Sequence, residues 1–163
     1  MILSAQSIRL RMNNPNLPRI KPFSESKQAL GMSYGLSHAG YDIRLGSFGS
    51  SSFVESWNLE PGDFILVSSL EWMSIPDDII GRVHDKSTLA RHGLALQNTI
   101  LEPGWFGHIT LEISNHSQNH YWLRKGQPIA QVIFELLDQP TERPYKGKYQ
   151  NQPNEPVQPK YEE

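Results

Sequence analysis

One carboxylate within an apolar segment, Glu112, is the residue of this sequence best suited to acid–base chemistry. It is flanked by Leu111 and Ile113 in HITLEIS. Partial removal from water raises the pKa of a carboxyl group, and a pKa near neutrality suits a group that both accepts and donates protons. The alternation of the segment also permits a structural interpretation, in which Glu112 shares an outward polar face with Thr110 and Ser114.

The hexapeptide KSTLAR, residues 86–91, carries groups that bind phosphate. It supplies two cations, two hydroxyl groups and, in a helical turn, free backbone N–H groups. The alternative interpretation is an ordinary solvated turn without a ligand.

A second carboxylate, Glu102, precedes Pro103-Gly104, and this dipeptide predicts a turn. Such a turn leaves the carboxylate at the end of a strand. There it could bind a sugar hydroxyl or activate a water molecule at a phosphate.

Zinc chemistry has little support in this sequence. The absence of cysteine excludes disulfides, thiol nucleophiles and zinc held by thiolates. His116 and His120 have the i, i+4 interval of a helical zinc site, but they lie in NHSQNH, which predicts a hairpin loop. No such pairing involves the other histidines, which are His38, His84, His92 and His108. We therefore expect no metal ligated by the protein.

The composition is that of one soluble domain. The chain has 163 residues, of which 37% are hydrophobic and 20% charged. Its formal net charge of −2 provides no basic field for nucleic acid. No apolar run approaches the roughly 18 residues of a membrane span, and the N-terminus lacks the pattern of a secretory signal. We therefore expect a cytoplasmic protein that binds neither nucleic acid nor membranes.

The elements that must position these residues are mainly strands. From Leu59 to Glu135, short apolar or alternating segments are separated by turn signals, a pattern typical of a barrel or jelly roll. Two short helices are expected, one that begins at Ser4 and runs through Ile8 and one within residues 86–91. The predicted strands are residues 64–70, 79–85, 94–100, 108–114 and 129–137.

Proline-rich segments flank this core. Residues 12–22 are expected to form a loop, and the last residues show no apolar periodicity. We divide the chain into one domain, residues 1–150, and a flexible proline-rich tail, residues 151–163.

Four stretches, taken together, resemble the dCTP deaminase and dUTPase superfamily. They are AGYDIRLG (39–46), HDKSTLARHGL (84–94), ILEPGWFGHITLEISN (100–115) and RPYKGKYQNQ (143–152). The last two resemble the deaminase branch. The resemblance implies a mainly β protein with a distorted jelly roll or β-barrel of the dUTPase-like type. It also implies a homotrimer with active sites between subunits, and Mg²⁺ that arrives with the nucleotide triphosphate.

The resemblance also implies roles for individual residues. Glu112 would be the proton shuttle, Ser87 would orient the catalytic water, and Arg91 would hold groups near the reacting base. Lys86 and Thr88 would contact phosphates. Tyr145, Lys148 and Gln152 match a C-terminal element that closes over the nucleotide. The remaining substrate-binding positions are Leu89, Ala90, Glu102, Thr110 and Leu111.

Three features depart from the pattern of the family. Glu102 stands where the family usually has aspartate, QNTILEPG (97–104) is about two residues short, and the C-terminal element is shorter between Tyr145 and Lys148. Asp42 matches a position that supports the magnesium triphosphate site in dUTPases, but we favour a structural role for it, and we expect Arg44 to pair with a nearby acid. The large aromatic residues are expected in the core or the trimer interface: Trp72, Trp105, Phe106 and Trp122.

The resemblance therefore implies a dCTP deaminase, which hydrolyses dCTP to dUTP and ammonia in pyrimidine deoxynucleotide metabolism without zinc. One alternative is a dUTP pyrophosphatase or a bifunctional enzyme, in which Glu102 activates the hydrolytic water. A second alternative is a catalytically silent nucleotide-binding regulator, a use that phages make of this fold.

Overall fold

The computed structural model describes residues 1–14, 17–49 and 53–161, and it consists mainly of antiparallel strands. One ten-stranded sheet has the central order β10-β12-β8-β6-β14-β9-β11, and each neighbouring pair on this path is antiparallel. These strands are β6 (Tyr41–Ser47), β8 (Phe64–Ser74), β9 (Ile79–Asp85), β10 (Leu94–Leu96), β11 (Ile100–Leu101), β12 (Phe106–Asn115) and β14 (Pro128–Leu136). The mainly β expectation is confirmed.

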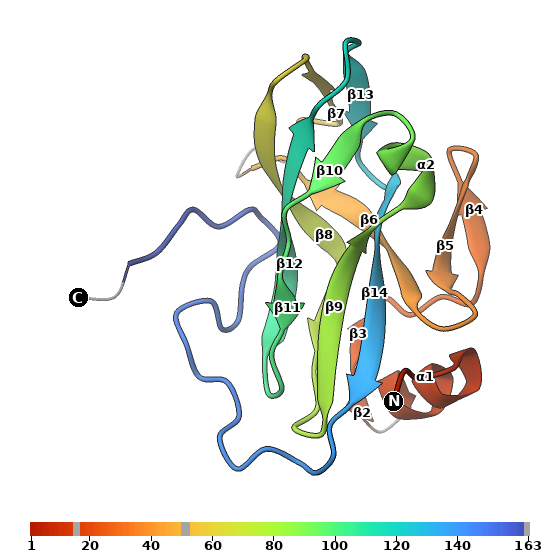
Figure 1. Cartoon of the computed structure of the whole chain (residues 1–163), viewed down its shortest axis with the longest axis vertical. Helices are drawn as coiled ribbons and strands as arrows, with labels where there is room; N and C mark the ends of the chain where they lie inside the picture. Colours follow the sequence, from red (N-terminus) through yellow and green to blue (C-terminus); the bar gives the residue numbers. More distant parts are fainter. Residues whose placement is uncertain (15–16, 50–52, 162–163) are drawn as a thin grey trace.

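Shorter strands extend the sheet or stand apart from it. β3 (Ile20–Lys21) pairs with β8, and β5 (Met32–Leu36) joins β4 (Lys27–Ala29) to β6. Separate two-stranded ribbons are formed by β1 (Asn13–Asn14) with β2 (Leu17–Pro18) and by β7 (Ser56–Leu59) with β13 (Tyr121–Arg124). The β7–β13 ribbon lies at one end of the molecule, far from α1 (Ala5–Met12) at the other (Figure 1).

Alternation along the strands builds the core. In β12 the buried positions are every second residue and include Ile109, Leu111 and Ile113, whereas Thr110 and Glu112 occupy the opposite face. β14 places Val132 and Phe134 in the same core as Tyr41 of β6. Each of these three side chains is fully buried. The alternation predicted for Thr110, Glu112 and Ser114 is therefore confirmed.

Several boundaries differ from those predicted. Residues 12–22, expected to be a loop, contain three two-residue strands, because Ile20 is buried and pairs with Met73 at the end of β8. The predicted strand 94–100 ends at Leu96. NHSQNH joins β12 to β13, which do not pair with one another, so it is a connection and not a hairpin loop.

The helices begin where the sequence places them. Ser4 precedes α1, although its side-chain oxygen contacts the Ser7 hydroxyl and makes no capping bond. α1 continues to Met12 because Ile8 and Met12 pack into the core. The second helix, α2 (Ser87–Ala90), is a single turn. In the described ranges, no helix is long and apolar enough to cross a membrane.

The aromatic residues are less uniform than expected. Trp105 is buried in the core, as predicted, whereas Trp122 is 50% exposed on the β7–β13 ribbon. Trp72 and Phe106 are half-buried, with ring centroids 6.1 Å apart. Trp122 therefore lies outside the core, because β13 pairs only with β7 and presents alternate residues to solvent, and its place in a trimer interface stays a prediction.

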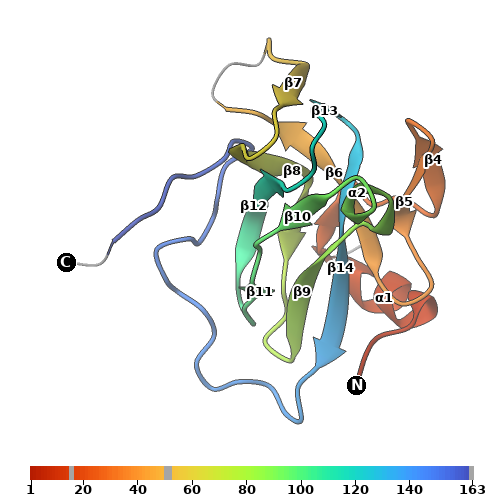
Figure 2. The same cartoon turned by 45° about the horizontal axis from the view of Figure 1, so that its top comes forward.

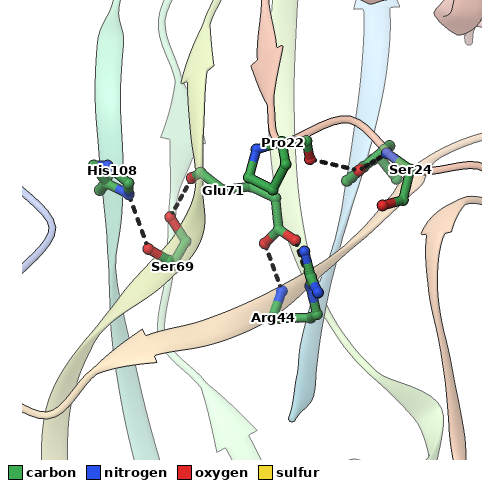
Figure 3. A network of polar contacts seen from close by, with 7 residues as sticks. Pro22, Ser24, Arg44, Ser69, Glu71 and His108 are labelled. Atoms are coloured by element: carbon green, nitrogen blue, oxygen red, sulfur yellow. Dashed lines mark hydrogen bonds and ion pairs between the residues drawn. The ribbon is translucent and has the colours of Figure 1, made fainter. Parts of the chain in front are cut away.

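A buried ion pair joins β6 to β8. Glu71 is fully buried and accepts hydrogen bonds from both the backbone N–H and the guanidinium of Arg44, at 2.8 and 2.7 Å (Figure 3). Burial raises the pKa of Glu71, and the bonds from Arg44 oppose that rise. Next to it, Ser69 donates to the Glu71 carbonyl oxygen and accepts at its own carbonyl from the His108 ring. The expectation that Arg44 pairs with an acid is confirmed.

Removing one partner of this ion pair should be costly. We expect Arg44→Met to lower the free energy of unfolding by about 3–5 kcal/mol at pH 7, because Glu71 would keep a buried charge without a counter-ion. Without Arg44 the folded-state pKa of Glu71 rises further, so the folded variant binds a proton more readily as the pH falls. Urea unfolding should therefore show a smaller deficit at pH 5 than at pH 7.

A matched control is available on the surface. Arg82 pairs with Glu135 at 2.6 Å, with both side chains partly exposed. Arg82→Met should cost about 1 kcal/mol or less at either pH. Equal losses in the two variants would contradict the special role of the buried pair.

Candidate active site

A cavity of about 480 Å³ lies where the two ends of the curled sheet meet. β12 and β11 are far apart in the strand order, yet residues of both line it, so the sheet must curl to bring them together. The chain beyond β14 returns along this side of the sheet (Figures 1 and 2). The lining residues are Phe64, Leu66, Val83, Asn98, Thr99, Ile100, Leu101, Glu102, Trp105, Ile109, Thr110, Glu112, Tyr145, Tyr149, Gln152, Val157, Gln158 and Pro159.

Glu112 contributes a half-buried carboxyl group to this cavity. Burial raises its pKa above the ordinary value of 4.5. In the part of the chain that the structure describes, its carboxylate oxygens make no hydrogen bond or ion pair. The two interpretations of the sequence are thus compatible: Glu112 lies on the polar face of β12, and that face borders a cavity. The group is placed to exchange protons with a ligand.

Thr110, on the same face, connects β12 to the C-terminal segment. Its hydroxyl donates to Gln152 Oε1 at 2.6 Å and accepts from the backbone N–H of Val157 at 3.0 Å. Ser68 of β8 donates to Asn154 at 3.1 Å. Residues 152–157 therefore lie along the rim of the cavity, and the flexibility expected for the tail from residue 151 stays a prediction.

Of the two C-terminal residues Tyr145 and Lys148, only Tyr145 lines the cavity. Tyr145 lines the cavity, donates its backbone N–H to Pro103 and accepts from the Tyr149 N–H at 3.1 Å. Lys148 is exposed and does not line the cavity; its ammonium lies 5.5 Å from the centroid of the Tyr149 ring. Lys148 can therefore reach only a charged group that extends beyond the cavity.

Glu102 lies at the predicted turn. Its carbonyl accepts from the Trp105 N–H at 3.0 Å, and its half-buried side chain lines the cavity with Glu112. Gly104 has a φ of 86°, and a Cβ there would lie 2.6 Å from Pro144. The glycine is therefore required both by the turn and by the close approach of the C-terminal segment.

None of the residues 86–91 lines the cavity. Lys86 is buried, with its ammonium 2.8 Å from Asp42 and 3.3 Å from the Ser33 hydroxyl. Asp42 also accepts from Gln131, which agrees with the structural role expected for it. The phosphate contact predicted for Lys86 would have to use the third N–H of an ammonium group already held by two partners.

The rest of α2 is divided between core and surface. Leu89 is buried in the hydrophobic core, as is Leu111 of β12, so a substrate could meet these two residues only through their backbones. The other residues of 87–91 for which a role at the substrate is predicted have exposed side chains: Ser87, Thr88, Ala90 and Arg91. Within one chain, the structure brings together Glu112, Thr110, Glu102, Tyr145 and Gln152, but not the α2 residues.

Several lining residues were missed from the sequence. Asn98 donates its side-chain amide to the Thr110 carbonyl at 2.8 Å and accepts from the Glu112 N–H at 3.2 Å. Tyr149 accepts from the Trp105 indole at 2.7 Å. The tail residues 157–159 also border the cavity, although their composition indicated only a polar tail. No local pattern singles out Asn98, because it falls within the predicted strand 94–100.

The described residues that line the cavity carry acidic but no basic side chains. Among the described lining residues there is no lysine or arginine, while two carboxyl groups are present. A ligand would therefore place an uncharged portion inside and its anionic groups outside. The structure describes no group of three or more His, Cys, Asp or Glu residues that could hold a metal ion. Fold and site together define a mainly β protein with a cavity for a small molecule and a half-buried carboxyl group of raised pKa beside it.

Comparisons with known proteins specify this class further. Residues 49–137 match the family model described as dCTP deaminase-like. A dCTP deaminase of Acidobacterium capsulatum is 37% identical over 158 residues, covering 82% of this chain and 86% of the relative. A dCTP deaminase of Pyrococcus abyssi is 34% identical, covering 80% of this chain and 84% of the relative. The chain belongs to the dCTP deaminase-like family.

Solved structures show the same fold. The native dUTPase of EIAV matches with a TM-score of 0.56 at 19% identity, over 80% of this chain and 97% of that one. The 2′-deoxycytidine 5′-triphosphate deaminase of Agrobacterium tumefaciens matches with a TM-score of 0.63 at 21% identity, over 83% of this chain and 48% of that one. The dUTPase-like fold expected from the sequence is confirmed.

Proposed function

We propose that this protein hydrolyses dCTP to dUTP and ammonia, with Glu112 as the proton shuttle. The observation that carries the proposal is a half-buried carboxyl group of raised pKa beside a cavity of about 480 Å³, within a chain whose curated relatives are named dCTP deaminases. A cavity of this size suits a small molecule and is lined mostly by apolar side chains. The cytosine and sugar would occupy it, with the phosphates outside.

The chemistry needs one group that first removes and then returns protons. Glu112 accepts a proton from a water molecule, and the resulting hydroxide forms a bond to C4 of the cytosine. Glu112 passes that proton to N3, giving a tetrahedral intermediate. It then transfers the hydroxyl proton to the amine, the C4–N bond breaks as the C4=O bond forms, and the proton on N3 is retained. One water is consumed and one ammonia is released.

The segments around the cavity would share the binding of the nucleotide. Glu102 would accept a hydrogen bond from the 3′-hydroxyl of the sugar. Tyr145 and Gln152, which already border the cavity, would contact the base and sugar, and exposed Lys148 would meet phosphate. Closure of residues 143–152 over the nucleotide would keep water away from the intermediate.

The exposed α2 groups would act on the cavity of a neighbouring subunit. Ser87, Thr88 and Arg91 project from the surface and none lines the cavity of its own chain. A homotrimer would bring them to the partner's Glu112, with Ser87 orienting the water, Arg91 holding groups near the base and Thr88 at a phosphate. Lys86 would stabilise this segment through its ion pair with Asp42 and would donate its remaining N–H to phosphate.

We also propose that the protein is cytoplasmic, as its sequence led us to expect.

Mg²⁺ would come with the triphosphate. The two carboxyl groups that line the cavity are too few to bind Mg²⁺ without other ligands. Phosphate oxygens and water would therefore supply most of its ligands. Bound in that way, the ion would neutralise phosphate charge and orient the tail of the substrate.

A bifunctional enzyme that also splits dUTP is the second candidate. Glu102 lines the same cavity as Glu112, and its longer side chain could activate a water molecule at the α-phosphate. If so, dUTP formed at Glu112 would be converted to dUMP and pyrophosphate.

The test is to incubate the purified chain with Mg²⁺ and dCTP, and separately with dUTP. Nucleotides are separated by anion exchange while ammonia and pyrophosphate are assayed. Ammonia with accumulating dUTP supports the deaminase, dUMP with pyrophosphate from dCTP supports the bifunctional enzyme, and turnover of dUTP alone supports a dUTP pyrophosphatase. No turnover of either nucleotide refutes both and leaves the silent nucleotide-binding regulator.

The choice of metal gives a separate prediction. Dialysis against EDTA should lower deamination about tenfold or more, and Mg²⁺ should restore it, because the triphosphate charge would otherwise be left unscreened. Millimolar 1,10-phenanthroline, a chelator selective for transition metals, should have no effect. Inhibition by phenanthroline with recovery on adding Zn²⁺ would refute the zinc-free mechanism.

A further inference from the structure

The strand that carries Glu112 loses its backbone partner beside the cavity. β10 pairs with β12 through Leu96 opposite Ile113, and the Gln97 N–H still donates to the Glu112 carbonyl at 3.0 Å. An antiparallel pair would next return a bond from the Glu112 N–H to the Gln97 carbonyl. That bond is absent from the described contacts, because the chain turns away at residues 98–100 to form one wall of the cavity.

The side chain of Asn98 supplies the missing groups. Its Oδ1 accepts from the Glu112 N–H at 3.2 Å, in place of the Gln97 carbonyl. Its Nδ2 donates to the Thr110 carbonyl at 2.8 Å, where the next N–H of β10 would have donated. A carboxamide has the same acceptor and donor as a peptide group, so Asn98 continues the ladder while its own backbone leaves it.

We propose that Asn98 is a positioning residue, which holds the backbone of Thr110 and Glu112 fixed where the main chain departs to open the cavity. Both polar ends of its amide bond to β12, so it acts on the reaction through the backbone of Thr110 and Glu112. Thr110 is held by the same amide, and its hydroxyl binds Gln152 and Val157. One side chain therefore fixes both the acid–base residue and the attachment of the C-terminal segment.

The kinetic part of this proposal rests on the proposed function. Without the amide, the Glu112 N–H and the Thr110 carbonyl must find water, and β12 can shift beside the cavity. We expect Asn98→Ala and the nearly isosteric, uncharged Asn98→Leu, which lacks both the donor and the acceptor, to lower kcat for dCTP about 10- to 100-fold. KM should change less than about threefold, since the other walls of the cavity are kept. Greater access of water should also move the acidic limb of the pH–rate profile to lower pH.

The adjacent residue provides a matched control. The Gln97 side chain donates to the Ser114 hydroxyl at 2.7 Å, also on β12, but Gln97 does not line the cavity. Gln97→Ala removes one bond to the same strand and leaves the Gln97 backbone bond to Glu112 intact. Its kcat should stay within about twofold of the wild type and its pH–rate profile should not move.

A readout that does not require turnover separates failure of the inference from failure of the proposed function. Carboxyl ¹³C NMR of the whole protein should report a lower pKa for Glu112 in Asn98→Ala than in the wild type, and no change in Gln97→Ala. Should Asn98→Ala fail to fold, Asn98→Leu, which is uncharged and has nearly the same shape, carries the same comparison. An unchanged Glu112 titration in the Asn98 variants, or an equal fall of kcat in Gln97→Ala, overturns the proposal whether or not dCTP is the substrate.

Discussion

Replacing Glu112 by glutamine should lower kcat for dCTP deamination by about a thousandfold or more, while dCTP still binds within about threefold of the wild-type affinity. General acid–base catalysis contributes roughly 10²–10⁴-fold, and in the proposed mechanism one group both removes and returns the protons. Glutamine keeps the shape of the side chain but cannot exchange protons. Steady-state assays of ammonia release and calorimetric titration with dCTP measure the two quantities.

Glu102→Gln is the matched control for this variant, because it changes the other carboxyl group of the same cavity. If Glu102 binds the sugar hydroxyl, its loss should raise KM more than it lowers kcat. A Glu112→Gln enzyme that no longer binds dCTP, or a larger fall of kcat in Glu102→Gln, would refute the assignment of the proton shuttle.

The pKa of Glu112 predicts how activity and stability should depend on pH. Burial raises it, so kcat/KM should increase with pH through an apparent pKa above the ordinary 4.5. A raised folded-state pKa means that the folded protein binds the proton more tightly, so this group favours folding at low pH and opposes it once ionised. Glu112→Gln should therefore unfold at the same or a slightly higher temperature than the wild type at pH 8, which shows that lost activity is not lost folding.

The sequence predicted the residues of the cavity best where local pattern decides the structure. Alternation alone placed Thr110 and Glu112 on one face of a strand, and Pro103-Gly104 placed the turn beside Glu102. Alternation could not show whether that face meets solvent or a cavity, because this depends on the curl that brings β11 to β12. The resemblance to the family, and not the pattern, favoured the cavity.

Contacts between residues that are far apart in the sequence were the features that the sequence predicted least well. Glu71 lies in an apolar strand without a sequence signal for Arg44, 27 residues away, so only the general expectation of an acidic partner could be stated. Asn98 was included in a predicted strand, since its backbone groups are not distinguished in the sequence from those of its neighbours. The composition of residues 157–159 indicated a solvated tail, yet the Thr110 hydroxyl binds the Val157 N–H and holds this segment at the cavity.

Mixing two inactive variants should restore activity if each active site is built from two subunits. Arg91 is exposed directly after α2 and is absent from the cavity that Glu112 borders in the same chain. Arg91→Ala alone should therefore lower kcat about 100-fold or more, like the loss of other groups that stabilise charge in the transition state. In randomly mixed trimers of Glu112→Gln and Arg91→Ala chains, about a quarter of the sites would combine an intact Glu112 with an intact Arg91.

The experiment is to co-refold or coexpress the two variants, confirm the trimer by light scattering and measure ammonia release from dCTP. The control mixes Glu112→Gln with the double variant Glu112→Gln/Arg91→Ala, in which no site can be complete. Recovery only in the first mixture would mean that a neighbour supplies Arg91. If the trimer forms and neither mixture recovers, α2 must reach the cavity of its own chain by a rearrangement. A monomer with full wild-type activity would refute the shared site directly, because the exposed face of α2 would then have no second cavity to complete.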